Sequence, residues 1–249
     1  MDNNEVLLKP IRTRVDAVMM ATVVFLFLVT VVLGLFYDQL SLSLAIGIPA
    51  LIIPFLVWRA LKGTLVSRLS MASALIIQIA IQIQISHGLI EMHFGLFVVL
   101  AFLLAYRDWQ PIVSGAALIA TQHLVGNFLQ ASQLDVWIFH HGESFGIVLL
   151  HAAYVVFESV ILVYLAVQLR MEGIESAKVA LMAERITQGD LNYHIEVDHQ
   201  SESSGMLASM IAMQKHLSHL VTEIEVIVDA AVQGDFSKKI DLSNKNGFG

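Results

Sequence analysis

Long apolar segments, separated by short polar ones, occupy the first two-thirds of the chain. A helix needs about 20 mostly apolar residues to cross the hydrocarbon core of a bilayer. The predicted spans are Val15–Phe36, Leu40–Leu61, Val66–Ile85, Phe94–Tyr106, Pro111–Gln130 and Phe145–Leu169. The fourth is short, so we expect its helix to begin within Gly88–His93. Short connections place neighbouring helices antiparallel. The pattern therefore predicts an all-α membrane protein with a six-helix transmembrane bundle.

After the last span the apolar residues recur in heptads. Their spacing alternates between four and three residues, which is typical of a helix in a coiled coil. The positions are Met206, Met210, Met213, Leu217, Leu220, Ile224, Ile227 and Ala231. Eight successive matches favour a parallel, homomeric coiled coil over a solitary amphipathic helix.

Two short stretches in the same region repeat each other 45 residues apart. Residues 188–191 read Gln-Gly-Asp-Leu, and residues 233–236 read Gln-Gly-Asp-Phe. Each follows a helical segment and precedes an expected extended stretch. The corresponding apolar positions in those stretches are Ile195 and Val197, then Ile240 and Leu242. A repeat of this kind indicates a modular helical connector.

Composition agrees with a division of the chain into a membrane part and a polar part. Hydrophobic residues make up 57% of the sequence and charged residues only 14%, whereas soluble domains carry about 25% charged residues. The apolar excess lies before Arg170. We therefore expect a sensor domain at 1–169, a relay domain at 170–222 and the start of a second relay unit at 223–249. The net charge of −7 argues against nucleic-acid binding.

The basic residues predict how the spans are oriented. Under the six-span topology, all eight that precede Met171 fall on one side of the membrane. They are Lys9, Arg12, Arg14, Arg59, Lys62, Arg68, Arg107 and Arg170. Basic residues concentrate on the cytoplasmic side. We therefore expect a multi-pass protein of the bacterial inner membrane with both termini in the cytoplasm.

Six of the ten histidines lie in the membrane region, all in its outer half. They are His87, His93, His123, His140, His141 and His151. Further polar residues share helix faces with them: Asn127 and Gln130 follow His123, while Tyr154 and Glu158 follow His151. Gln78 and Gln82 form a third such face. Polar groups at membrane depth are costly unless they meet each other or water, so we expect these three faces to converge on the bundle interior.

Three interpretations of this convergence remain open. A transition-metal site, for copper or zinc, would draw its ligands from His87, Glu91, His93, His123, His140, His141 and His151. Haem b would need two facing histidines such as His123 and His151 in an apolar pocket, with Asn127, Tyr154 and Glu158 nearby. In the third interpretation, the polar groups bind a small organic ligand or form a purely structural network. With no cysteine in the chain, thiolate ligands are excluded.

From the last span onward the order of elements resembles a HAMP signal-relay domain. The resemblance is carried by a helix up to about Thr187, the Gly189-Asp190-Leu191 turn, the connector with Ile195 and Val197, and the heptad helix from Gly205. It implies a parallel dimer that forms a four-helix bundle below the membrane. The segment from Gln233 resembles the start of another such unit.

More widely, the chain resembles the front part of bacterial methyl-accepting chemotaxis proteins with a multi-span sensor domain. Residues 123–130 and 151–158 are similar to recurring features of that group. The resemblance implies a transmembrane chemoreceptor, homodimeric and able to form higher receptor arrays in membrane lipid. It also implies a cytoplasmic kinase and adaptor that bind a long signalling hairpin. That hairpin is missing here, so we expect the sequence to be a truncated front portion.

A histidine-rich integral-membrane enzyme is the main alternative to a receptor. Membrane di-iron oxidases need several closely spaced histidine pairs, but this chain has only the adjacent His140 and His141. Di-haem electron carriers place histidines about 13–14 residues apart on each of two helices, and that spacing does not occur either. We therefore expect a receptor and not an enzyme, with a haem-binding redox or gas sensor as the alternative to a metal sensor.

Overall fold

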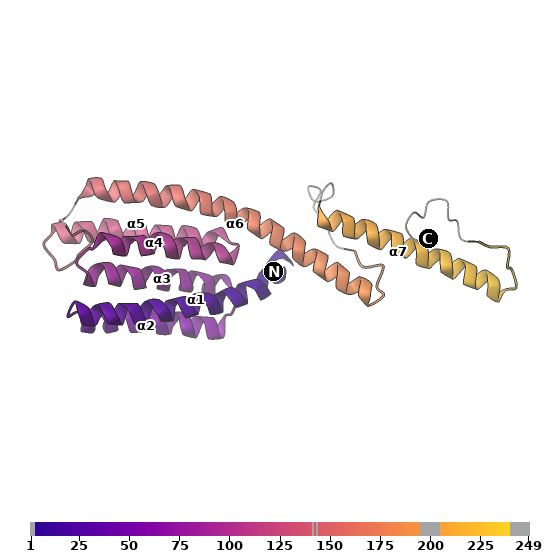
Figure 1. Ribbon diagram of the computed structural model, residues 1–249, viewed down its shortest axis with the longest axis horizontal. Coiled ribbons are helices and arrows are strands. Elements are labelled where there is room, and N and C mark those ends of the chain that lie inside the picture. The colour runs from indigo at the N-terminus through magenta and orange to yellow at the C-terminus, as the bar shows by residue number, and fades with distance from the viewer. Residues whose placement is uncertain (1–2, 141, 143, 195–204, 240–249) are drawn as a thin grey trace. The chain divides into compact units, whose positions relative to one another are not determined.

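The computed structural model describes residues 3–140, 142, 144–194 and 205–239, which form an all-helical protein (Figure 1). The elements are α1 (Asn3–Phe36), α2 (Leu40–Ala60), α3 (Leu65–Ile85), α4 (Ile90–Phe102), the 3₁₀ helix η1 (Leu103–Tyr106), α5 (Trp109–Ala131), α6 (Phe145–Thr187) and α7 (Met206–Val232). Within this part of the chain, five helices are long and apolar enough to span a membrane, and Ile90–Tyr106 is a shorter apolar helix. The fourth helix begins at Ile90, within the segment predicted for its start.

The chain forms two compact units, Met1–Gly173 and Ile174–Gly249. Their boundary falls inside α6, close to the expected division before Arg170. The expected extended stretches with Ile195 and Val197 and with Ile240 and Leu242 lie outside the described residues.

In the first unit, α3 is the central helix. It packs against α1 and α2 on one side and against α4 and α5 on the other (Figure 1). Within an apolar 18-residue stretch of each span, 67% of α3 is buried but only 17% of α6. The core includes Met71, Leu75 and Ile83, all fully buried. Because α6 lies at the edge, most of its apolar side chains face outward.

Glutamines of α3 bond across the interior of the bundle to α1 and α2, and not, in the described structure, to the polar faces of α5 and α6 with which they were expected to converge. Gln78 donates through Nε2 to the carbonyl of Gly47 (3.2 Å) and accepts from the hydroxyl of Thr30 (3.1 Å). Gln82 donates to the same hydroxyl (3.1 Å). Polar bonds of this kind help hold helices together where apolar surface gains nothing by leaving lipid. These two side chains therefore have a structural role.

One end of the first unit, which we call the basic end, contains a buried ion network. Arg68 is 2% exposed and lies 2.9 Å from the Asp108 carboxylate. Arg12, also buried, pairs with Glu5, and Glu5 in turn contacts Arg170 of α6 at 3.0 Å. The network joins α1, α3, α6 and the start of α5. The sequence pattern of these arginines predicts only the orientation of the spans and carries no signal for their pairing.

Asp16 is the most enclosed acid of the basic end, with 0% exposure. Its carboxylate accepts hydrogen bonds from the backbone of Gly63 (2.7 Å), the hydroxyl of Ser67 (2.9 Å) and the phenol of Tyr106 (2.9 Å). These donors come from three different parts of the chain. Asp16 therefore fixes the position of α1 against α3 and η1.

Gly173 of α6 is a point of close approach at the basic end. A Cβ added there would lie 2.5 Å from an Arg107 side-chain nitrogen and 3.1 Å from a Leu8 methyl carbon. The absence of a side chain therefore lets α6 run tightly past α1 and the end of η1.

In the second unit, the two Gly-Asp stretches adopt the same backbone structure. The amide of Asp190 bonds to the carbonyl of Arg185 (3.0 Å), and that of Asp235 bonds to Ala230 (2.9 Å), again 45 residues on. Gly189 and Gly234 have φ of +82° and +86°, a region that glycine enters without strain. Both helices therefore end in the same turn, in agreement with the sequence repeat.

The heptad helix forms as expected, since α7 covers Met206–Val232. Within the chain, however, its buried residues are Leu207 and Gln214, which lie off the heptad positions. Gln214 donates to the carbonyls of Leu191 and Tyr193 (2.9 and 2.7 Å). Heptad residues such as Met213 and Ile224 stay 45% and 50% exposed.

Candidate metal centre

Three of the predicted ligands, His93, His123 and His151, meet at the opposite end of the first unit, which we call the histidine end. They come from α4, α5 and α6. Each offers one ring nitrogen, and these nitrogens all lie within 4.8 Å of one another. The ring centroids form a nearly equilateral triangle with sides of 5.4, 5.4 and 5.5 Å. We call these residues the histidine triad.

All three rings of the triad are oriented in the same way. Each Nδ1 lies 2.9–3.2 Å from the backbone carbonyl four residues earlier on its own helix, at Leu89, Ile119 and Ile147. A carbonyl can only accept, so in each neutral ring the proton lies on Nδ1 and the lone pair on Nε2. A bond that fixes the tautomer in this manner is typical of metal-binding histidines.

The Nε2 atoms of His93 and His123 are buried, and within the described structure they have no hydrogen-bond partner. His93 is 2% exposed and His123 3%. A buried acceptor without a donor costs about 1–3 kcal/mol. A cation that accepts these lone pairs would remove that cost, so the geometry suits a metal ion.

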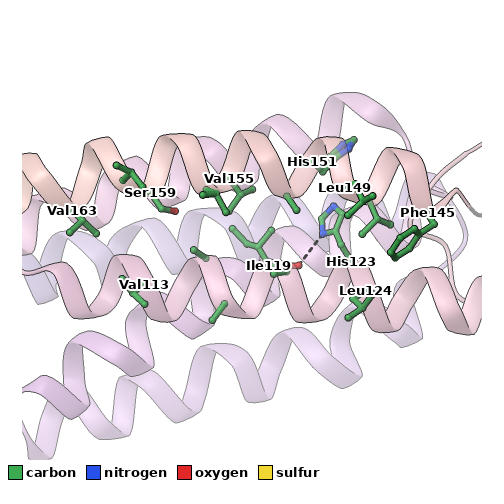
Figure 2. A pocket seen from close by; sticks show the side chains of 17 residues that line it. Val113, Ile119, His123, Leu124, Phe145, Leu149, His151, Val155, Ser159 and Val163 are labelled. Carbon is green, nitrogen blue, oxygen red and sulfur yellow. Dashed lines mark hydrogen bonds between the residues drawn. The ribbon is translucent and has the colours of Figure 1, made fainter.

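The surroundings of the triad are apolar. Phe139, from the segment between α5 and α6, stacks on His93 with ring centroids 6.0 Å apart and approaches His151 at 5.5 Å. Next to the triad a cavity of about 730 Å³ lies between α5 and α6. His123 and His151 line it together with residues such as Ile119 and Val155 (Figure 2).

Amide side chains hold the segment that carries Phe139. Gln130 accepts from the backbone of Ile138 and Phe139 (3.0 and 3.1 Å) and donates to the Phe139 carbonyl (2.8 Å). Asn127 accepts from the backbone of Ser144 (2.9 Å). Asn127 and Gln130 thus share a helix face with His123, as predicted, but they position a loop. Sequence patterns gave no signal for Phe139 itself.

Gly88 allows this segment to lie against the turn between α3 and α4. Its φ is +74°, and an added Cβ would come within 2.6 Å of the Phe139 carbonyl carbon and 2.7 Å of the His140 amide nitrogen. Both contacts are with backbone, which cannot rotate away as a flexible side chain can. A glycine is therefore required for the loop to reach the triad.

The remaining predicted ligands lie outside the triad. His87 packs edge-on against Trp137 (5.2 Å) and Tyr37 (6.2 Å), and its carbonyl lies 3.3 Å from His140 Nδ1. Glu91, in the first turn of α4, is exposed. His141 lies outside the described residues.

Tyr154 lines a cavity together with His93 and His151, but it is not part of the triad. Its side chain is 61% exposed, although it lies one turn beyond His151. The reason is that α6 is an edge helix and presents only a narrow strip to the bundle. Glu158 is half-buried, with one carboxylate oxygen lacking a hydrogen bond in the described structure. It lies seven residues from His151, roughly 10 Å along the helix, and is not part of the triad.

The arrangement fits a single ion better than haem b. A haem held by His123 and His151 must pass its macrocycle between the two rings. The His93 ring is 5.4 Å from both of them, in the space that the macrocycle would cross.

Comparison of the chain with protein-family models, curated proteins and solved structures finds no match.

Proposed function

We propose that this chain is the membrane and relay part of a transmembrane signal transducer, triggered by a transition metal at the histidine triad. The observation that carries the proposal is the convergence of three imidazoles from three helices, each with its proton fixed on Nδ1. Imidazole nitrogen suits copper and zinc. Gln78 and Gln130, by contrast, already bond to protein groups.

The route from the site to the output follows from the helix that His151 occupies. The same helix carries Arg170, which pairs with Glu5 at the basic end, and continues to Thr187. An ion bound at the triad would draw α4, α5 and α6 together. If the empty and occupied geometries differ, binding shifts the population of α6 positions. The repeated Gly-Asp turns and exposed heptad residues support a HAMP-like relay that forms a parallel homodimer.

The topology of the proposed receptor has six spans and both termini in the cytoplasm. Its support is that five long apolar helices and one shorter one alternate in direction, and that the paired arginines gather at one end. The resemblance to chemotaxis receptors further suggests a cytoplasmic kinase and adaptor as partners of the full-length protein.

Metal analysis combined with cysteine crosslinking tests this function. Because the chain has no cysteine, a single one introduced at Leu217 or Ile224 reports the approach of two α7 helices. We expect about one metal per purified chain, no haem absorption, and a crosslinking rate that changes when the metal is removed. His151→Ala should abolish both the metal and the response.

A matched control is His216→Ala, since His216 is an exposed histidine of α7. It should keep both the metal and the response. Purified protein without metal, or His151→Ala protein that still responds to metal, would contradict the proposal.

A further inference from the structure

We propose, building on the metal-binding function above, that the ion is monovalent copper, Cu(I), held in three-coordinate geometry by the Nε2 atoms of His93, His123 and His151. The first argument is the charge of the donor set. The cluster contains three neutral imidazoles, and among the described residues it includes no carboxylate. The ion's charge is therefore not neutralised by its ligands.

The cost of an uncompensated charge rises with the square of that charge in the Born description of ion solvation. A divalent ion would pay about four times the penalty of a monovalent ion in the same surroundings. The surroundings here are Phe139, which is 7% exposed, and an apolar cavity wall with Ile119 and Val155. The triad therefore favours a monovalent ion over Zn²⁺ or Cu²⁺.

The number of ligands leads to the same ion. Zinc in proteins is almost always four-coordinate, and where only three side chains bind it, water takes the fourth position. A buried water needs two to four polar partners. The cavity beside the triad is lined almost entirely by apolar side chains, with the hydroxyl of Ser159 as an exception. Three ligands in a nearly equilateral triangle suit Cu(I), which accepts trigonal coordination without a fourth ligand.

Direct competition between ions tests the charge and coordination. Purified full chain would receive equimolar Zn²⁺ and either Cu(I), supplied anaerobically as its acetonitrile complex, or Ag(I), a redox-inert monovalent analogue. After desalting, we expect about one Cu(I) or Ag(I) per chain and at least about tenfold less Zn²⁺. X-ray absorption of the copper form should show three nitrogen neighbours at about 2 Å.

Substitution by methionine sharpens the test. A thioether binds Cu(I) and Ag(I) but is a poor ligand for Zn²⁺. His123→Met should therefore keep Ag(I) within about threefold of the original affinity, whereas His123→Ala should lose at least about tenfold. His151→Met and His151→Ala provide the same contrast at a half-buried position, where a substitution disturbs the packing less than at the buried His123. His216→Met on α7 is the control and should change nothing.

The outcomes separate this inference from the function on which it rests. Retention of Zn²⁺ or Cu²⁺ in preference to Cu(I), with loss in His151→Ala, would overturn the inference and leave the metal-binding function standing. A four-coordinate copper spectrum, or equal loss of Ag(I) in the methionine and alanine variants, would overturn the inference too. Failure to retain any of these ions would overturn both.

Discussion

The two ends of the first unit bury polar groups to similar depths but use them in opposite ways. At the basic end, Arg68 and Asp16 are 2% and 0% exposed, and each contacts several donors, acceptors or opposite charges. At the histidine end, His93 and His123 are 2% and 3% exposed and leave one acceptor each without a partner. Burial alone therefore does not mark a site. What distinguishes the histidine end is the kind of atom left over. Arg12 Nη2 and Arg68 Nε at the basic end also lack a hydrogen-bond partner in the described structure, but they are donors on cations, whereas the Nε2 lone pairs of His93 and His123 can bind a metal cation.

Removal of Asp16 should have the largest effect on stability. Asp16→Ala deletes an acceptor of three hydrogen bonds inside the basic end and leaves their donors unpaired. We expect a loss of about 3 kcal/mol, which corresponds to a melting temperature roughly 6–12 °C lower in detergent. Glu91→Ala, at an exposed acid, is the control. If the buried polar contacts of the basic end do not stabilise the fold, Asp16→Ala and Glu91→Ala will have the same melting temperature.

Removal of a buried polar group at the histidine end should raise the stability of the metal-free protein instead of lowering it. His123→Leu replaces a buried acceptor that has no donor by an apolar group. In metal-free protein we expect stabilisation by about 1–2 kcal/mol. Saturating metal should reverse the order, because only the original protein gains binding free energy, about 2.7 kcal/mol at 100 times the Kd. Thermal melting with and without metal checks both signs. If the leucine variant is the less stable one without metal, the imidazole has a structural partner after all.

Replacement of Gly88 should damage the site through the loop that carries Phe139. Gly88→Ala places a Cβ against the backbone of Phe139 and His140, so we expect at least about tenfold weaker metal binding. Gly142→Ala is a closely matched control, because Gly142 also has a positive φ (+94°) but nothing within 4 Å of its added Cβ. Metal titration of both variants measures the difference. Equal weakening would assign the effect to backbone strain and not to the loop contact.

The smallest expected effect concerns Glu5, whose side chain is 33% exposed. Glu5→Gln weakens its ion pairs with Arg12 and Arg170, but solvent screens part of that interaction. We expect a loss of at most about 1 kcal/mol together with a faster metal-independent crosslinking rate at Ile224. The double variant Glu5→Gln, His151→Ala tests whether the two ends affect α6 independently. If their effects on crosslinking simply add, the ends act on α6 independently.

The sequence predicted where the helices lie because long apolar runs and a sustained heptad spacing are themselves signatures of helices. Which partner covers the heptad face of α7 stays a prediction. Thr187 and Met206 bound the connector close to where the repeat and the heptads placed it. The three histidines of the triad were among the seven predicted ligands. Polar side chains at the same depth of an apolar bundle are costly unless they face one another or water, so their depth alone favours a cluster.

Other parts of the site depend on tertiary geometry that no periodic pattern records. Phe139 reaches the triad through hydrogen bonds to Gln130, eight to nine residues away, and through space left by Gly88. The pairing of Glu5 with Arg170 spans 165 residues. Tyr154 stays largely exposed because α6, at the edge, presents only a narrow strip to the bundle, and that edge position is set by the packing of the other helices.

Gly173 has a mechanical consequence. The 43 residues of α6 contain no proline, and its glycines are Gly146 and Gly173. From His151 to Arg170 the helix is an uninterrupted rod of roughly 28 Å. A displacement of α6 at His151 would therefore move the helix at Arg170 by a similar distance. Just beyond it lies Gly173, close to Leu8 and Arg107, and because glycine has a low helix propensity a bend in α6 would cost less there than at its neighbours. If α6 bends at Gly173, a displacement of the triad would change the direction of the helix at that residue.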